Sequence, residues 1–245
     1  MDILIIHLGS ISDNIIASSI VKSIHSQYKD PKIYWVVKGE NSKNVFKYNK
    51  NIHKAITIEE FVNMNNKNWN IFINLHPGFS KEDCNKISSN NKMGFFNNND
   101  EDLSILYSLG KTTSMSSIQI YHRLIGKKWK GSGYDIGYFP KTKSNPKRAG
   151  IFISNMNLKH YCLSNLYHDS MKSNALWVIP FKKNLFKKMD EINRCGSVIT
   201  DDLTTMHLSI YLRKYVYFLE TLPQSTRYEF FGRGQTYVAP ISIIR

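Results

Sequence analysis

Four short stretches in the first half of the chain are almost continuously apolar, and they constrain the fold more than any other feature. They span residues 3–7, 33–37, 55–58 and 71–75. Uninterrupted apolar runs of this length are typical of strands buried on both faces, as in a parallel sheet covered by helices. The pattern therefore predicts an α/β fold.

The segment between the first two runs, "SDNIIASSIVKSIHSQY", has the periodicity of a helix, with Ser12 expected as its N-cap. Its apolar residues recur at helical spacing and are Ile15, Ile16, Ile20, Val21 and Ile24. Strand, helix and strand in this order make a βαβ unit. A second helix is expected over residues 114–124, closed by Gly126 at a C-cap position.

The α/β pattern starts again at Ala149, after a basic stretch rich in Gly, Ser and Pro. Strands are expected over "AGIFIS", "NALWVIP", "GSVITDD" and "YVYFLE", and helices over "NLFKKMDEINRC" and "TTMHLSIYLRK". The Asn-rich stretches "NMNNKNWN" and "SSNNKMGFFNNNDED" are expected to be surface loops. We therefore predict a domain over 1–140, a basic linker over 141–148 and a domain over 149–245, with a ligand cleft between the domains.

An excess of positive charge favours an anionic partner. The 33 Lys and Arg residues against 19 Asp and Glu residues give a net charge of +14. Nucleic acid, a nucleotide, a phosphorylated glycolipid and an acidic membrane surface all satisfy this condition. Biased base composition of the gene would equally explain a chain rich in Lys, Asn and Ile.

Cysteine usage and the amino-terminal segment indicate a cytoplasmic setting. Cys84, Cys162 and Cys195 are widely spaced, which predicts neither a disulfide framework nor a zinc site. The segment "MDILIIHLGS" has no basic stretch, and its apolar run is far shorter than the ~20 residues that span a bilayer. We expect a cytoplasmic protein, with peripheral association at the inner face of the membrane as an option.

A turn containing Ser and Gly follows the first apolar run. It offers only Gly9, whereas a dinucleotide fingerprint needs G-x-G-x-x-G, so NAD and FAD are not expected there. The free N–H groups at the start of a helix favour an anion or a developing negative charge, and they stabilise Asp13 as a carboxylate. The pattern leaves two interpretations of Asp13, an ordinary helix-start acid and a catalytic base.

A second polar segment, "SVITDDLTTMHLS", follows an apolar strand in the second half. It brings Asp201 and Asp202, then the hydroxyls of Thr204 and Thr205, then His207 near the start of a helix. The carboxyl ends of strands in an α/β sheet face the ligand crevice, so these groups are placed to meet phosphate or ribose. Ordinary helix capping explains the same residues.

Three basic runs are more typical of a solvated face than of a nucleic-acid site. No helix-turn-helix, RNP-like or zinc-finger signature accompanies them, so nucleic acid is the least favoured partner. The runs consist of Lys127, Lys128 and Lys130 around Trp129, of Lys141, Lys143, Lys147 and Arg148, and of Lys182, Lys183, Lys187 and Lys188.

Two segments taken together resemble the bacterial heptosyltransferases, glycosyltransferase family 9. "ILIIHLGSISDNIIASSIVKSI" is similar to the family's opening, in which the first strand leads through a Ser-rich turn into an Asp-headed helix. "TDDLTTMHLS" resembles its second signature, an Asp-Thr-Gly stretch followed two residues later by Ser or Met and then His. The segments "KIYWVVK", "NWNIFINLHP", "KMGF" and "AGIFIS" agree in order. The resemblance covers most of the chain.

The resemblance implies a GT-B-like architecture, in which two Rossmann-like α/β domains face a cleft. The first domain would bind the acceptor and the second a nucleotide sugar. The implied reaction is the inverting, metal-independent transfer of a sugar from ADP-heptose to a lipopolysaccharide-core or other anionic surface glycan, without a cofactor. Asp13 would be the general base, and Ser10, Ser12 and His76 would lie on the side of the acceptor or an anion.

The residues of the family's donor signature match this sequence less completely. Asp202 and His207 fall on the Asp and His of the family's donor signature, with Thr204 and Thr205 between them, and Lys159 in "SNMNLKHY" matches a lysine near the donor phosphates. Three departures stand beside these matches. Ser12 replaces a Gly, "Leu-Thr" replaces "Thr-Gly" after Asp202, and the second domain is reduced. A catalytically lapsed GT-B-like protein that binds a nucleotide, a glycan or a partner subunit therefore stays open as an alternative.

Overall fold

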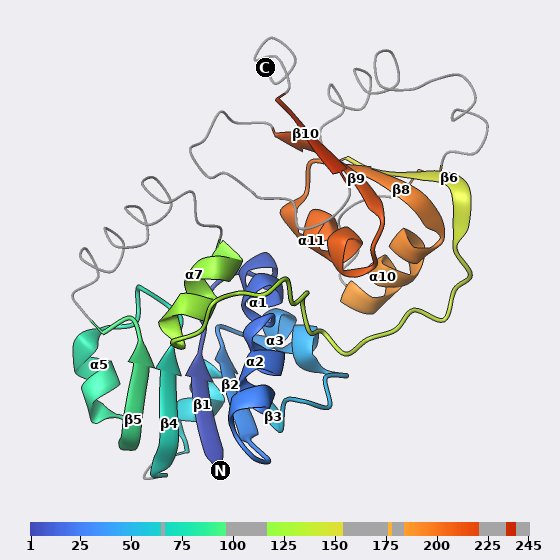
Figure 1. Cartoon of the computed structure of the whole chain (residues 1–245). Coiled ribbons are helices and arrows are strands. Elements are labelled where there is room, and N and C mark those ends of the chain that lie inside the picture. Colours follow the sequence, from blue (N-terminus) through green and yellow to red (C-terminus); the bar gives the residue numbers. More distant parts are fainter. Residues whose placement is uncertain (65–66, 97–116, 154–175, 178–183, 221–233, 239–245) are drawn as a thin grey trace. The chain divides into compact units, whose positions relative to one another are not determined.

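The buried apolar runs pair as parallel strands in two separate sheets (Figure 1). The computed structural model describes residues 1–64, 67–96, 117–153, 176–177, 184–220 and 234–238. The chain divides into unit 1, Met1–Tyr138, and the smaller unit 2, Phe139–Arg245, each built on one five-stranded sheet. The predicted α/β class is confirmed. Within the described ranges, no helix is long and apolar enough to cross a bilayer.

Unit 1 has strand order β3-β2-β1-β4-β5. Its central strand β1 pairs with β2 and β4, so that Ile3 lies beside Ile33 and Ile71. The four residues Ile3 to Ile6 are fully buried, and each contributes about 1.5–3 kcal/mol by burial. The elements are β1 Asp2–Ile6, α1 Ile11–Ala17, α2 Ile20–Gln27, β2 Lys32–Val37, α3 Glu40–Lys43, the 3-10 helix η1 Asn44–Phe46, β3 Lys54–Thr57, α4 Ile58–Val62, β4 Trp69–Asn74, α5 Lys81–Lys86, β5 Ser89–Gly94 and α7 Ser117–Leu124.

The single helix predicted after β1 is wrong in two respects. The chain forms two helices, α1 and α2, with a break at Ser18 and Ser19. The Ser18 hydroxyl donates to the carbonyl of Ile15 at 2.6 Å, and such local bonds compete with a continuous helix. The N-cap is Ser10 rather than Ser12, because the backbone is extended at Ser10 and its side chain accepts from Asp13 N. Ser12 lies inside α1, where no glycine is required.

Strand β5 occupies part of a stretch that was predicted to be a loop. Its residues are mostly polar, so it lacks the apolar run by which the other strands were predicted. They pair in parallel register with β4 at the edge of the sheet. Gly94 ends the strand with φ at +108°. A Cβ on Gly94 would stand 1.9 Å from the carbonyl oxygen of Asn74, so this position accepts only glycine.

Helix α7 agrees with the described part of the predicted helix over 114–124. Gly126 has φ at +69°, and its N–H donates to the carbonyl of Arg123 at 2.9 Å. The Lys127 N–H donates to the carbonyl of His122 at 2.9 Å, which completes a C-terminal cap. The cap ends α7, and the helix packs against α1.

Unit 2 has strand order β10-β9-β8-β6-β7, with all neighbours parallel. The sheet begins earlier than Ala149, because β6 starts at Asn145 within the stretch predicted to be a linker. Asn145 pairs with Cys195, and a register shift follows before Ala149. The elements are β6 Asn145–Phe152, β7 Leu176–Trp177, α10 Leu185–Asn193, β8 Cys195–Thr200, α11 Leu203–Tyr211, β9 Tyr215–Glu220 and β10 Gly234–Val238.

Candidate functional site

The turn from β1 to α1 holds Asp13 by a reciprocal cap. Asp13 Oδ2 accepts hydrogen bonds from the Ser10 N–H at 2.8 Å and from the Ser10 hydroxyl at 2.7 Å. The Asp13 N–H donates to Ser10 Oγ at 3.3 Å. Within the described part of the chain, Asp13 Oδ1 accepts no hydrogen bond, and the side chain is half-buried. One carboxylate oxygen is thus held by the turn while the other is available to a ligand.

Buried side chains fix the backbone of this turn. Ser12 is 8% exposed and its hydroxyl lies 2.8 Å from that of Ser10. Asn14 is fully buried and donates to the carbonyls of Gly9 and Ser10 at 3.1 and 2.9 Å. The side-chain oxygen Oδ1 of Asn14 accepts a hydrogen bond from Trp35 Nε1 on β2 at 3.1 Å. Asn14 therefore ties the turn to the core of the sheet, a role that the sequence did not reveal.

His7 is a further residue of the site that sequence reasoning missed. It follows β1, is 2% exposed, and its Nδ1 accepts from the Gly9 N–H at 3.1 Å. Burial lowers the pKa of His7 to about 4, with Asp13 opposing and His76 adding to the shift. The imidazole is therefore neutral at neutral pH, with its proton on Nε2, which donates to the Tyr121 hydroxyl on α7 at 2.8 Å.

Gly9 lies very close to the side chains of both His7 and Asp13. A Cβ on Gly9 would lie 2.6 Å from His7 Cε1 and 2.9 Å from Asp13 Oδ2. The imidazole and the carboxylate therefore both lie against the space that a side chain at position 9 would occupy, so a Cβ there would force them to shift. In addition, burial and the negative charge of Asp13 both raise the pKa of Tyr121, which keeps the phenol protonated.

His76 completes the group of side chains at this edge of the sheet. It follows β4, which is the neighbour of β1, and its ring centre lies 6.1 Å from that of His7. Burial lowers the pKa of His76, with Asp13 acting in the opposite direction. Unit 1 thus brings together four of the predicted residues, Ser10, Ser12, Asp13 and His76, at the carboxyl ends of β1 and β4.

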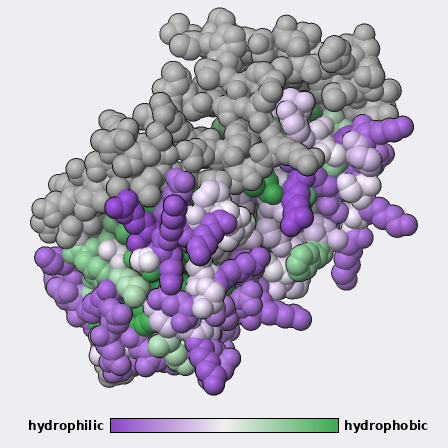
Figure 2. All heavy atoms as spheres, viewed as in Figure 1, coloured by the Kyte–Doolittle hydropathy of each residue, from purple (hydrophilic) through white to green (hydrophobic). Residues whose placement is uncertain are grey.

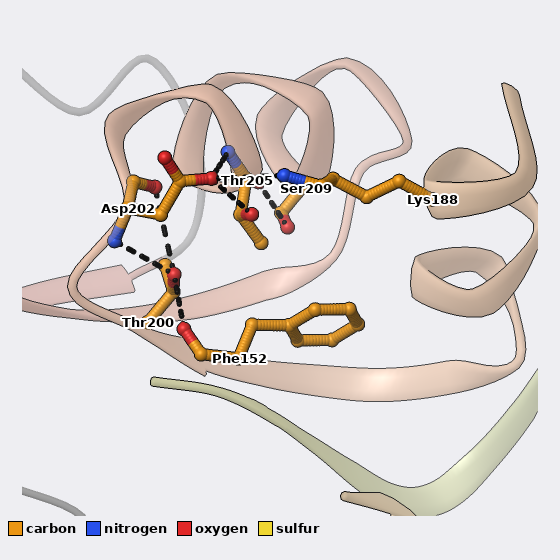
Figure 3. Close-up of polar contacts among 6 residues, drawn as sticks. All are labelled: Phe152, Lys188, Thr200, Asp202, Thr205 and Ser209. Carbon is orange, nitrogen blue, oxygen red and sulfur yellow. Dashed lines mark hydrogen bonds and ion pairs between the residues drawn. The ribbon is translucent and has the colours of Figure 1, made fainter. Parts of the chain in front are cut away.

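Asp202 organises the predicted donor segment in unit 2 (Figure 3). It is the N-cap of α11, and its Oδ2 accepts from the Thr205 N–H at 2.8 Å and from the Thr205 hydroxyl. The Asp202 N–H donates to Thr200 Oγ1 at 3.0 Å, and the Thr200 hydroxyl donates to the Phe152 carbonyl at 2.8 Å. The cap is therefore fastened to the ends of β8 and β6.

The other predicted donor residues differ in exposure. Thr204 is half-buried, whereas Thr205 and His207 are buried on α11. Lys159 lies outside the described residues. Within the described ranges, no three His, Cys, Asp or Glu side chains are placed to hold a metal ion.

Within the described ranges, most residues of the basic runs are exposed, as predicted, whereas Lys182 and Lys183 lie outside the described residues. On the face shown in Figure 2, hydrophilic side chains are spread over the described parts of both units. Lys188 is the exception, because it is only 8% exposed and its Nζ lies 3.2 Å from Asp202 Oδ2. Its assignment to a solvated face is therefore wrong.

Comparison with known proteins places the fold. No family model matches the sequence, and no curated protein matches it significantly. Among solved structures, a glycosyl transferase family 9 protein from Veillonella parvula matches with a TM-score of 0.63 at 14% identity, over 96% of this chain and 85% of that one. The E. coli ADP-heptose lps heptosyltransferase II matches with a TM-score of 0.68 at 11% identity, over 97% and 90%.

A third match is the E. coli heptosyltransferase WaaC with ADP, with a TM-score of 0.62 at 10% identity, over 98% of this chain and 94% of that one. The chain has the fold of glycosyltransferase family 9. The predicted GT-B-like α/β class with a smaller second domain is thereby confirmed, and so is the family resemblance at the level of the fold. At 10–14% identity, the match concerns the fold and not the reaction.

Proposed function

We propose that this protein is an inverting, metal-independent glycosyltransferase that moves a heptose or related sugar from a nucleotide-sugar donor to a lipopolysaccharide-core or other surface-glycan acceptor. The observation that carries the proposal is the carboxylate of Asp13, which is held by Ser10 through Oδ2 alone, at a βα turn of a family 9 fold. Solved structures with this fold contain ADP and ADP-2-deoxy-2-fluoro heptose, which supports a nucleotide-sugar donor.

In the proposed reaction, Asp13 Oδ1 takes the proton of an acceptor hydroxyl. The resulting oxygen attacks the anomeric carbon of the donor, and the bond from that carbon to the nucleotide diphosphate breaks on the opposite face. The electron pair of that bond leaves with the diphosphate, so the anomeric configuration inverts. Because Asp13 Oδ2 stays bonded to Ser10, only Oδ1 moves a proton, and the carboxylate keeps its orientation.

The remaining predicted residues divide between the two substrates. Ser10, Ser12 and His76 would bind the acceptor or its anionic groups. On the donor side, Asp202, Thr204, Thr205, His207 and Lys159 would bind the nucleotide sugar. The net charge of +14 favours approach to an anionic glycolipid at the inner face of the membrane, at about 1 kcal/mol per well-placed basic residue.

The proposal is tested by incubating the protein with ADP-heptose and a panel of lipopolysaccharide-core acceptors. Transfer is measured as the release of ADP. Asp13→Asn is expected to abolish ADP release while the protein stays folded. Asp83→Asn is the matched control, because Asp83 has the same bond with Ser80 at the start of α5 and is also a helix-start acid. It should retain full turnover. Full turnover by Asp13→Asn would refute the role of the base.

A catalytically lapsed binding protein is the second candidate. Leu203 and Thr204 stand where the family has Thr and Gly, and a glycine there would let the backbone approach a phosphate closely. This candidate predicts that the wild-type protein binds ADP but releases none from ADP-heptose with any acceptor of the panel.

A further inference from the structure

Two lysines are buried in the described part of unit 2, and they have different partners. Lys214 is 7% exposed, and its Nζ donates to Ser144 Oγ and to the Asn193 carbonyl, which are neutral oxygens of the framework. Lys188 is 8% exposed, and its Nζ donates to Asp202 Oδ2 from the neighbouring helix α10. Lys188 thus points to Asp202, the carboxylate that caps α11 in the donor segment (Figure 3).

Capping of α11 does not by itself require this lysine. Asp202 already accepts from the N–H and the hydroxyl of Thr205, which is a complete N-cap. Bringing an ammonium group into the interior costs free energy, which the ion pair has to offset. Lys188 therefore adds something that a cap without it would lack: a positive charge and a third hydrogen bond to the same oxygen.

The consequence for Asp202 is that its two carboxylate oxygens differ. Oδ2 accepts from Thr205 twice and from Lys188 once, whereas Oδ1 accepts no hydrogen bond in the described part of the chain. The backbone N–H of Asp202 is bonded to Thr200. Bonds from α10 and α11 thus hold Oδ2, and a bond to β8 holds the Asp202 backbone, so Oδ1 is left to accept a hydrogen bond from a hydroxyl.

We propose that Lys188 is a positioning residue of the donor site, which holds Asp202 so that Oδ1 accepts a hydroxyl of the nucleotide sugar. The proposal rests on the proposed function, because it takes residues 200–207 as the donor segment. The ammonium group also offsets the negative charge of Asp202, which would otherwise repel the donor diphosphate. The bound hydroxyl belongs either to the ribose or to the transferred sugar, since both present the same donor group to a carboxylate.

Calorimetric titration of the full chain with ADP and with ADP-heptose tests this role. We expect Lys188→Met to weaken binding by about tenfold or more, since it removes a charge-assisted bond from a ligand-binding carboxylate. Lys187→Met is the matched control, because Lys187 is the adjacent residue of α10 and is exposed. It should bind as the wild type does. Weaker binding of both ligands assigns the hydroxyl to ribose, and weaker binding of ADP-heptose alone assigns it to the transferred sugar.

A double-mutant cycle separates positioning from a general loss of structure. If Lys188 acts through Asp202, then Lys188→Met changes affinity by less than about twofold in an Asp202→Asn background. The double variant also removes both charges together, so it stays informative if Lys188→Met alone fails to fold. Lys188→Arg should recover part of the affinity, and the donor KM should rise in Lys188→Met while the acceptor KM does not.

Two results would overturn the inference, and they are distinguishable. Wild-type affinity in a folded Lys188→Met protein, or additive effects of the two substitutions, refutes the role of Lys188 and leaves the donor site intact. Failure of the wild-type chain to bind either ADP or ADP-heptose refutes the donor site itself, and with it the proposed function.

Discussion

Acidification tests the electrostatics of the turn that carries Asp13. Burial lowers the pKa of His7 from 6.5 to about 4, so the folded protein binds a proton at this imidazole more weakly than the unfolded chain does. Protonation therefore favours unfolding. The stabilisation from neutral His7 is complete above about pH 6.5 and is lost as the pH falls towards about 4.

The size of the effect follows from the displacement of the pKa. A change from 6.5 to about 4 corresponds to about 3.4 kcal/mol in total, at 1.36 kcal/mol per unit. Between pH 7.5 and pH 4.5, the linkage relation gives a loss of about 2.5 kcal/mol from His7 alone. This loss is a large fraction of the stability of an ordinary domain.

Urea unfolding of the wild type and of His7→Gln at pH 7.5 and pH 4.5 isolates the contribution of His7 to the free energy of unfolding. Tryptophan fluorescence reports mainly on unit 1, because three of the four tryptophans lie there, with Trp35 and Trp69 buried in its sheet, and only Trp177 lies in unit 2. Other groups titrate in both proteins, so the difference in free energy of unfolding between them is the quantity to follow. We expect this difference to shrink by about 2.5 kcal/mol at the lower pH. A difference that stays constant to within about 0.5 kcal/mol would refute the burial of a neutral His7.

Three substitutions test other parts of the fold by urea unfolding. Tyr121→Phe should cost about 1–3 kcal/mol, because it leaves the buried His7 Nε2–H without its acceptor; a loss below about 0.5 kcal/mol would contradict the bond. Gly94→Ala should cost roughly 3 kcal/mol or more, whereas Gly131→Ala, with φ at +82° and nothing within 4 Å, should cost only about 1–2 kcal/mol; equal costs would contradict the contact with Asn74. Lys67→Met should cost about 1 kcal/mol, since the ammonium lies 3.9 Å from the Tyr34 ring centre and 2.6 Å from Asp2 Oδ2; an unchanged stability would refute this contribution.

The sequence predicted the central strands because burial on both faces leaves a continuous apolar run. It missed β5, since an edge strand with exposed polar residues has no such pattern. We predicted Ser12 as the N-cap, although the spacing of Ser10 and Asp13 also fits a capping box. The extended backbone at Ser10, with ψ at 176°, decides between them.

Contacts between residues far apart in the sequence build much of the site. The bond between His7 and Tyr121 joins residues 114 positions apart, so only the fold brings them together. The burial of Lys188, in contrast, could have been predicted from the sequence. Lys188 lies three residues after Leu185 and four before Ile192, on the buried face of α10. We instead predicted that Lys188 is exposed, because it belongs to a run of lysines.

A structure determined with bound ADP tests the central claim most directly. We predict that the nucleotide lies at the amino end of α11, against residues 200–207, where a hydroxyl of a bound nucleotide sugar would reach Asp202 Oδ1. A nucleotide bound elsewhere, or none at saturating ADP, would contradict a donor site in unit 2 and the transferase function that depends on it.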